Sequence, residues 1–327
     1  MNIRISPPLC FSAQGQKENQ EDALYPPAGK ADANSRVLIV CDGMGGHEHG
    51  EVASQAVAQT IGNRMKKAAV GSADATRQEI ETALNEAYSQ LDSLDHSDDN
   101  SRKMGTTLTL LARCSEGFMA AHIGDSRIYQ LRRGRGVLFQ THDHSLVNDL
   151  IASGELTEDE ARRFERRNVI TRAIMPHQEF PAKATVRLIS DIQPGDVFLL
   201  CSDGVVEQID NPELADIMLS NSPLAIRLAR LEKECARRHT RDNHSCYAFE
   251  VEQADGMNES RKQSAATNEK AVSPQPANKR SMRAWIFAII AFLALAVAVI
   301  AYQAFSQPSH AKKETKVSTQ GNIKRNK

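Results

Sequence analysis

The segment of residues 37–54 constrains the fold of this chain more than any other stretch. It begins with the apolar run Val37–Cys41, which is rich in β-branched residues and predicts a buried strand. Asp42 ends the run, and Gly43-Met44-Gly45-Gly46 follows at once. Glycine allows a sharp turn and a close approach of bare peptide oxygens. The pattern predicts a carboxylate beside backbone carbonyls at the end of a rigid strand, which suits a hard divalent cation.

From Glu51 the sequence changes to helical spacing. Val52, Ala56, Val57 and Ile61 recur on one face, and we expect that face to be buried. An Asp-Gly pair between a strand and a helix is also ordinary turn chemistry, so this segment alone does not establish a metal site.

Two further carboxylates stand at the ends of predicted strands. The run Val197–Val205 carries an apolar strand into Asp203-Gly204, and Asp242-Asn243 precedes a last strand over residues 245–251. Strand ends at one edge of a β core can converge. Three carboxylates brought together repel one another unless cations neutralise them, so Asp42, Asp203 and Asp242 favour a metal site.

The polar segment of residues 12–24 holds Glu21 and Asp22 side by side. On a strand, adjacent side chains face opposite ways, so only one of the two can point directly at a given ion. The other would act through water or backbone, and a solvated acidic turn is the alternative. Lys17 lies five residues before Asp22 and could hold an anionic substrate, although most single lysines simply face solvent.

The remaining patterns predict alternating strands and helices. A helix is expected over residues 76–94 and another over residues 223–239, with strands over residues 104–112, 117–124, 127–131 and 137–141. Residues 143–176 contain a helix that stops at Gly154, a capping box formed by Thr157 and Glu160, and a crowd of arginines. This segment is either a recognition flap or a charged, solvated helix.

Charge is unevenly distributed along the chain. Residues from Asp255 onward hold 12 Lys and Arg against 4 Asp and Glu, and the residues before it hold 28 against 37. A basic tail is typical of a nucleic-acid or anionic-membrane partner, and here we expect the membrane and no nucleic acid. The six cysteines are scattered without metal-ligand spacing, which is typical of reduced, mostly buried thiols in a cytosolic protein.

The C-terminal part predicts a membrane anchor. The body is expected to span residues 1–253, followed by a flexible linker over residues 254–283. Residues 284–305 then form a run of 22 residues without a charge, with Trp285 and Tyr302 near its ends, and residues 306–327 form a basic tail. A helix of that length spans about 33 Å, enough for a bilayer core. No secretion signal begins the sequence, so we place the body in the cytoplasm and expect a single-pass inner-membrane protein.

Taken together, the motifs resemble the metal-dependent protein phosphatases, the 2C-type serine/threonine phosphatases, in their bacterial form. The resemblance covers residues from about 12 to 252. The matching segments are Asn19-Gln20-Glu21-Asp22, Asp42-Gly43-Met44-Gly45-Gly46-His47, Gly105-Thr106-Thr107, Gly124-Asp125-Ser126-Arg127, Asp143-His144-Ser145-Leu146-Val147, Ser202-Asp203-Gly204 and Asp242-Asn243.

The resemblance implies an α+β fold, a four-layer α-β-β-α sandwich of two antiparallel sheets flanked by helices. It also implies two Mn²⁺ or Mg²⁺ ions, bridged by Asp42 and held by the Gly43 carbonyl, Asp203 and Asp242. Glu21 and Asp22 would act mainly through bound waters, and Asp125 with Asp203 would hold a third, weaker ion. In that family a metal-activated water attacks phosphorus in line, so no covalent phosphoenzyme is expected.

Two residues depart from the family pattern. Lys17 stands where members usually place an arginine that grips the substrate phosphate, and lysine cannot make a bidentate contact. Met44 stands where eukaryotic members place a histidine thought to protonate the leaving group, so no general acid is assigned.

The expected function is a membrane-anchored phosphatase that acts on phosphoserine and phosphothreonine in proteins and opposes a Ser/Thr kinase. Two alternatives share the fold: a non-catalytic phosphoprotein-binding module, and a phosphomonoesterase for small molecules. Turnover of p-nitrophenyl phosphate with Mn²⁺ would exclude the first, and a comparison of phosphoprotein with metabolite turnover would separate the second.

Overall fold

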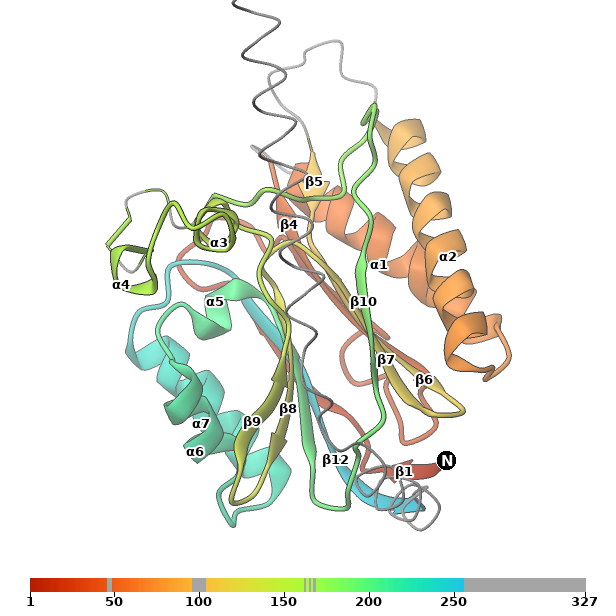
Figure 1. Ribbon diagram of the computed structural model, residues 1–327, viewed down its shortest axis with the longest axis vertical. Coiled ribbons are helices and arrows are strands. Elements are labelled where there is room, and N and C mark those ends of the chain that lie inside the picture. The colour runs from red at the N-terminus through yellow and green to blue at the C-terminus, as the bar shows by residue number, and fades with distance from the viewer. Residues whose placement is uncertain (46–48, 96–103, 162, 165, 167–168, 256–327) are drawn as a thin grey trace, which may run out of the picture. The chain divides into compact units, whose positions relative to one another are not determined.

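Two six-stranded antiparallel sheets form the centre of the protein (Figure 1). The computed structural model describes residues 1–45, 49–95, 104–161, 163–164, 166 and 169–255. The first sheet has the order β1 (Asn2–Ile5), β12 (His244–Asp255), β11 (Val197–Cys201), β8 (Arg127–Arg132) and β9 (Gly136–Gln140), and β2 (Leu9–Ala13) also pairs with β12. The second has the order β10 (Thr185–Ile189), β7 (Gly117–Ile123), β6 (Leu108–Cys114), β4 (Val37–Met44) and β3 (Asp22–Tyr25), and β5 (Gly105–Thr106) pairs with β4.

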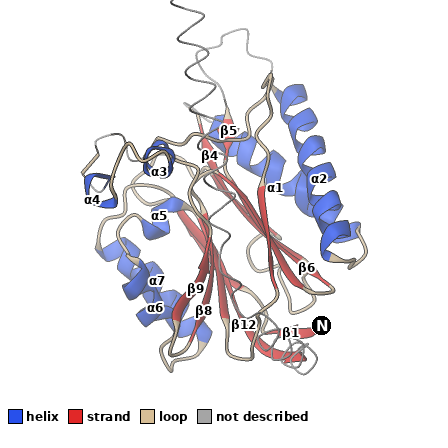
Figure 2. Ribbon diagram, viewed as in Figure 1, coloured by secondary structure: helices blue, strands red, loops and turns tan. Residues whose placement is uncertain are grey.

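Helices cover the outer face of each sheet (Figure 2). On the second sheet lie α1 (His49–Lys67) and α2 (Ala73–Leu94), and on the first lie α6 (Asn211–Met218) and α7 (Leu224–Arg237). Three short helices occupy connections: α3 (Leu146–Ala152), α4 (Glu158–Ala161) and α5 (Asp203–Val206).

Three apolar cores hold these four layers together. Along β4, Val37, Ile39 and Cys41 pack with α1 and α2, whereas Leu38 and Val40 pack between the sheets. The same alternation runs along β11, where Leu199 faces α6 and α7 and Leu200 faces the other sheet. Because side chains of a strand alternate between faces, each of these strands is buried on both sides and reads as a continuous apolar run. The expected four-layer arrangement of two antiparallel sheets flanked by helices is confirmed.

The expected face of α1 was wrong at its first residue. Val52 is 40% exposed, whereas Ala53, Val57 and Ile61 are buried against the second sheet. Ala53, Val57 and Ile61 are spaced four residues apart and therefore share one face of a helix with 3.6 residues per turn, whereas Val52 lies off that face.

The predictions for residues 254–327 lie almost entirely outside the described residues. Residues 254 and 255 end β12, so this strand extends two residues beyond the expected domain boundary. The expected linker beyond them, the apolar segment of residues 284–305 and the basic tail belong to the part of the chain that is not described. Among the described helices, none is both long and apolar enough to cross a bilayer.

Candidate metal centre

Asp42 lies where β4 leaves the core between the two sheets. It follows Leu38 and Val40 on the face of β4 that looks toward the first sheet, because residues two apart on a strand share a face. Its backbone is fixed on both sides. Its N–H donates to Thr107 Oγ1 at 3.0 Å, and its carbonyl accepts from Thr106 Oγ1 and from the Thr107 N–H, each at 2.9 Å.

Asp22 is the direct cross-strand neighbour of Asp42, since β3 pairs with β4 in the register Asp22↔Asp42. It is buried, and its Oδ2 accepts a hydrogen bond from Ser202 Oγ at 2.8 Å. Ser202 lies on the other sheet, at the end of β11, and its Oγ also accepts from the N–H of Ser245 at 3.0 Å. This chain of contacts joins β3, β11 and β12, so both sheets meet at one end of the sandwich.

Asp203 and Asp242 come from the first sheet at this same end. Asp203 begins α5 directly after Ser202, and Asp242 stands two residues before β12. The strands β11 and β12 are antiparallel with Cys201 opposite Cys246, so the end of one lies beside the start of the other. The structure thus brings Asp42, Asp203 and Asp242 to one end of the two sheets.

Lys17 forms an ion pair with Asp242, at 2.9 Å between Nζ and Oδ1. Burial lowers the pKa of Lys17, but the hydrogen bond and the charge of Asp242 outweigh it and raise that pKa above its usual value. The lysine therefore stays charged at the mouth of the carboxylate cluster, where it is partly exposed.

Glu21 is held at the edge of the cluster through its backbone. Its carbonyl accepts from the Gly43 N–H at 3.1 Å, and its N–H donates to Asn243 Oδ1 at 2.8 Å. The packing here leaves no room for side chains. A Cβ on Gly43 would lie 2.2 Å from the Gly50 carbonyl oxygen, and a Cβ on Gly50 would lie 2.7 Å from Glu21 Oε1.

Asp125 lies in the turn that carries the chain from β7 to β8. Gly124 before it has a φ of +99°, which only glycine adopts easily, and this lets the chain pass from one sheet to the other. Ser126 after it is hydrogen-bonded to Thr107, 2.7 Å between the two Oγ atoms. Asp125 thus shares a support with Asp42.

The cluster carries more negative charge than its hydrogen bonds satisfy. Buried oxygens of Asp22, Asp125 and Asp203, Oδ1 in each, have no hydrogen-bond partner in the described part of the chain. Burial raises the pKa of Asp22 to about 7, and the charges of Asp203 and Asp242 add to this rise. Burial likewise raises the pKa of Asp125 to about 7, helped by the charges of Asp203 and Asp143.

The same causes act on Asp42 and Asp203. Burial and the charge of Asp22 raise the pKa of Asp42 well above its usual range, and Asp203, Asp125 and Asp242 contribute. Burial and the charge of Asp242 raise the pKa of Asp203 in the same way. Unpartnered buried oxygens and repelling carboxylates are what a divalent cation relieves, so the residues present fit a metal site.

Within the described ranges, no three His, Cys, Asp or Glu side chains form a set that could hold one ion by themselves. Any ion here needs other oxygen ligands as well, such as backbone carbonyls and water.

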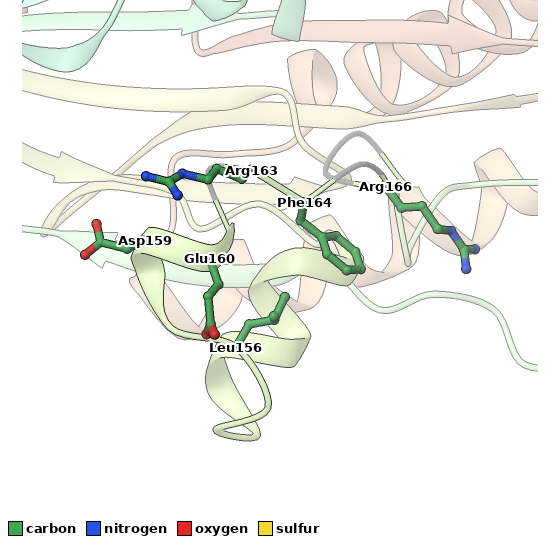
Figure 3. A pocket seen from close by; sticks show the side chains of 6 residues that line it. All are labelled: Leu156, Asp159, Glu160, Arg163, Phe164 and Arg166. Carbon is green, nitrogen blue, oxygen red and sulfur yellow. The ribbon is translucent and has the colours of Figure 1, made fainter.

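The arginine-rich segment lies beside this end of the molecule as a loop with α3 and α4. Thr157 and Glu160 form the expected capping box, in which Thr157 N–H donates to Glu160 Oε2 at 2.8 Å and Glu160 N–H donates to Thr157 Oγ1 at 3.3 Å. Figure 3 shows a hollow of the segment, formed by α4 and the loops on either side of it. Its lining residues are Leu156, Asp159, Glu160, Arg163, Phe164 and Arg166. None of the clustered carboxylates lines this hollow, so it is separate from the candidate metal centre.

Sequence reasoning left several supporting residues without a role. Ser202, Thr106, Thr107 and Asn243 all position the carboxylates through hydrogen bonds. Asn243 is buried, and its Nδ2 donates to the carbonyls of Gln14 and Asn19, 2.8 and 2.9 Å away. Ser202, Thr106 and Asn243 each adjoin an acidic residue or a glycine in the motifs, and Thr107 follows Thr106, so their place in the motifs is the signal that could have singled them out.

Known proteins match this chain over the two-sheet body. Residues 12–240 match the protein phosphatase 2C family. Protein phosphatase PhpP of Streptococcus pneumoniae is 37% identical over 213 residues, which make up 64% of this chain and 83% of PhpP.

Solved structures agree with the sequence matches. The crystal structure of the Mycobacterium tuberculosis serine/threonine phosphatase PstP/Ppp superposes with a TM-score of 0.66 at 27% identity, over 76% of this chain and 100% of that chain. The catalytic domain of the serine/threonine protein phosphatase PstP in complex with 2 manganese ions superposes with a TM-score of 0.60 at 27% identity, over 77% of this chain and 100% of that chain. Since the family match extends over well more than half of the sequence, this chain belongs to the protein phosphatase 2C family.

Proposed function

We propose that this protein is a divalent-metal-dependent phosphatase that hydrolyses phosphoserine and phosphothreonine in proteins. The observation that carries the proposal is the set of unpartnered, buried oxygens of Asp22, Asp125 and Asp203 at one end of the two sheets. The serine/threonine phosphatases among the similar structures, one of them in complex with manganese, support the same reading.

Each residue of the cluster has a proposed role. Asp42, the Gly43 carbonyl, Asp203 and Asp242 would hold two Mn²⁺ or Mg²⁺ ions, with Asp42 as the ligand shared between them. Glu21 and Asp22 act through bound waters, which accords with the hydrogen bond that Ser202 donates to one Asp22 oxygen. Asp125, together with Asp203, would hold a third and weaker ion.

Cations bound there supply Lewis acidity and a water of lowered pKa for attack on phosphorus. The chain itself fixes the geometry: the hydrogen bonds of Thr106 and Thr107 hold the Asp42 backbone, and Asn243 holds that of Glu21. Lys17 holds a phosphoryl oxygen of the substrate at the mouth of the site. No described cysteine lies in a phosphate-binding loop, and five of the six are buried, so the proposal has no covalent phosphoenzyme.

Catalysis should require the cation. With Mn²⁺ the purified full-length protein is expected to hydrolyse p-nitrophenyl phosphate and phosphothreonine peptides, and a chelator should abolish both reactions. Release of p-nitrophenol and of inorganic phosphate measures this. Failure to hydrolyse either compound with any divalent cation would favour the non-catalytic binding module. Faster turnover of small metabolites than of phosphopeptides would favour the small-molecule phosphomonoesterase.

Lys17→Ala is expected to raise KM for a phosphopeptide about three- to tenfold, because one partly exposed charge on the phosphate contributes about 1 kcal/mol. Lys17→Arg should keep KM at or below the wild-type value, since a guanidinium can make two parallel hydrogen bonds to a phosphate. Steady-state kinetics with saturating Mn²⁺ measures both variants. Equal KM values for the three proteins would contradict the role of Lys17 in phosphate binding.

We further propose that residues 284–305 anchor the protein in the inner membrane, with the body in the cytoplasm and a Ser/Thr kinase as its biological opponent. The support is the uncharged run of 22 residues between basic flanks. Such a run is long enough to span a bilayer core.

The anchor has a direct test in cell fractions. The full-length protein is expected in the membrane pellet after a high-salt or alkaline wash, and a chain that stops at residue 255 in the supernatant. Immunoblotting of both fractions measures this. Release of the full-length protein by high salt would show electrostatic attachment and contradict the anchor.

A further inference from the structure

A groove lies at the end of β4, close to the carboxylate cluster. Met44 is the last residue of β4 and lies on the same face as Asp42, two residues earlier. It lines a groove of about 460 Å³ together with Ile170, Arg172, Met175, Phe180 and Lys183. Two residues of a strand span about 7 Å, so the groove starts within two residues of an extended peptide from the candidate metal centre.

The floor of this groove is made of two methionine side chains. Gly105 lies opposite Met44 on the neighbouring strand. A Cβ on Gly105 would lie 2.9 Å from Met175 Cγ and 3.2 Å from Met44 Cγ, so both side chains pack over the bare glycine. Methionine is flexible and polarisable, which allows a floor of this kind to accept apolar side chains of different shapes.

The rim of the groove is aromatic and positively charged. Phe180 is 83% exposed, the highest value among the large exposed hydrophobic residues that the structure describes. Arg172 and Lys183 are exposed, and neither has a carboxylate partner within the described part of the chain. The lining of the groove contains no Asp or Glu.

The groove is held in place before anything binds. Thr106 and Ile174 exchange two backbone hydrogen bonds of 2.9 Å, which join the wall of the groove to β5, and Thr106 Oγ1 also supports Asp42. Further along, Tyr88 of α2 donates its hydroxyl to the Ala182 carbonyl at 3.0 Å. A preformed surface loses little conformational freedom when another polypeptide binds to it.

We propose that this groove binds the substrate polypeptide next to the phosphorylated residue. It selects phosphoproteins that carry an apolar side chain one to three residues from the phosphoserine or phosphothreonine, with acidic residues flanking that side chain. The apolar side chain packs on Met44 and Met175 under the Phe180 ring, and the acidic residues pair with Arg172 and Lys183. This inference rests on the proposed phosphatase function, and it adds a sequence preference to it.

The test compares two matched sets of phosphothreonine peptides on the full-length protein with Mn²⁺. The peptides of one set carry leucine and glutamate at positions within three residues of the phosphothreonine, and those of the other carry serine and glutamine there. Wild type is expected to favour the first set about tenfold in kcat/KM at the best position, a usual ratio for one apolar contact. Phe180→Ala and Lys183→Glu should each reduce the preference for the first set at least about threefold, the one by removing an apolar contact and the other by reversing a charge on the rim.

Two variants on α7 are the controls. Ile226→Ala removes an apolar side chain that is 59% exposed, and Lys233→Glu reverses an exposed charge on the same helix, against the other sheet. Both should keep the wild-type ratio between the peptide sets. Unchanged ratios in both Phe180→Ala and Lys183→Glu would contradict the binding of the substrate polypeptide in this groove. A wild-type protein that hydrolyses neither peptides nor p-nitrophenyl phosphate would instead contradict the phosphatase function itself.

Discussion

Asp42→Asn is expected to make the metal-free protein unfold at a higher temperature at pH 8, although it reduces phosphatase activity by about 10³-fold or more. The two effects have one cause. Burial and the charges of Asp22, Asp203, Asp125 and Asp242 raise the pKa of Asp42, so its ionised form is destabilised in the folded protein. Asparagine has nearly the same shape and removes that charge. It also removes a ligand that is proposed to bridge two cations, and with it the means of activating water.

Thermal unfolding in the presence of a chelator measures the first effect, and hydrolysis of p-nitrophenyl phosphate measures the second. A rise in Tm of at least about 2 °C is expected, the shift that about 1 kcal/mol gives in a domain of this size. Added Mn²⁺ should raise the Tm of wild type and leave that of the variant nearly unchanged. Asp216→Asn, on the exposed side of α6, should leave both measurements at the wild-type values. A lower Tm for Asp42→Asn would contradict the view that carboxylate repulsion dominates this site.

The strands that build the site were readable from the sequence because they are buried on both faces. The runs Val37–Cys41 and Val197–Cys201 each pack against helices on one side and against the other sheet on the other. Such strands need no polar alternation, and an apolar run that ends at an Asp is conspicuous. The spacing pattern also predicted α2, whose Ile80, Leu84 and Leu91 are buried as expected.

Elements with less apolar content were missed, because they lack the continuous apolar run of a strand that is buried on both faces. β10 has Arg187 and Leu188 exposed at the edge of its sheet, and β3 has only four residues after a polar loop. α6 did carry a signal: Asp210 accepts a hydrogen bond from the N–H of Glu213, and a proline lies in the first turn. An Asp followed two residues later by Pro is a helix start, and it could have been recognised.

The site was only partly predictable, because its geometry depends on register between strands far apart in the sequence. Nothing local places Asp22 opposite Asp42, or Ser202 within hydrogen-bonding distance of Asp22. The ion pair of Lys17 with Asp242 joins residues that no periodic pattern connects. Sequence reasoning could identify which carboxylates end strands, whereas their relation to one another comes from the pairing of β3 with β4 and of β11 with β12.

A fall in the stability of the metal-free protein between pH 6.5 and pH 8 is the second large effect to expect. Asp22 and Asp125 have a pKa of about 7 in the folded protein, against about 3.9 in an unfolded chain. A carboxyl group with a raised pKa binds its proton more tightly when folded. Its contribution to stability is therefore complete below about pH 4 and is lost as the pH rises through 7.

His144 acts with the opposite sign and sets the lower limit of this window. Burial lowers the pKa of His144 to about 4, helped by the charges of His122 and Arg172, and its Nδ1 accepts from the Gly124 N–H at 3.2 Å. The stability that this neutral histidine contributes is present above about pH 6.5 and is lost as the pH falls toward 4. Below pH 6.5 the effects of His144 and of the two aspartates on stability have opposite signs. Above pH 6.5 only the two aspartates among these three groups still titrate.

Tm measured with a chelator at intervals from pH 6.5 to pH 8 should therefore fall steadily, and saturating Mn²⁺ should remove the slope by replacing the protons as the positive charge in the site. Asp125→Asn deletes one of the two titrating groups and leaves the hydrogen bonds of Asp42 and Asp22 in place, so it should reduce the slope without removing it. A metal-free Tm that stays constant over this range would mean that the carboxylates ionise without penalty. The electrostatic reason for a cation at this end of the sheets would then be lost, even though the family relationship would stand.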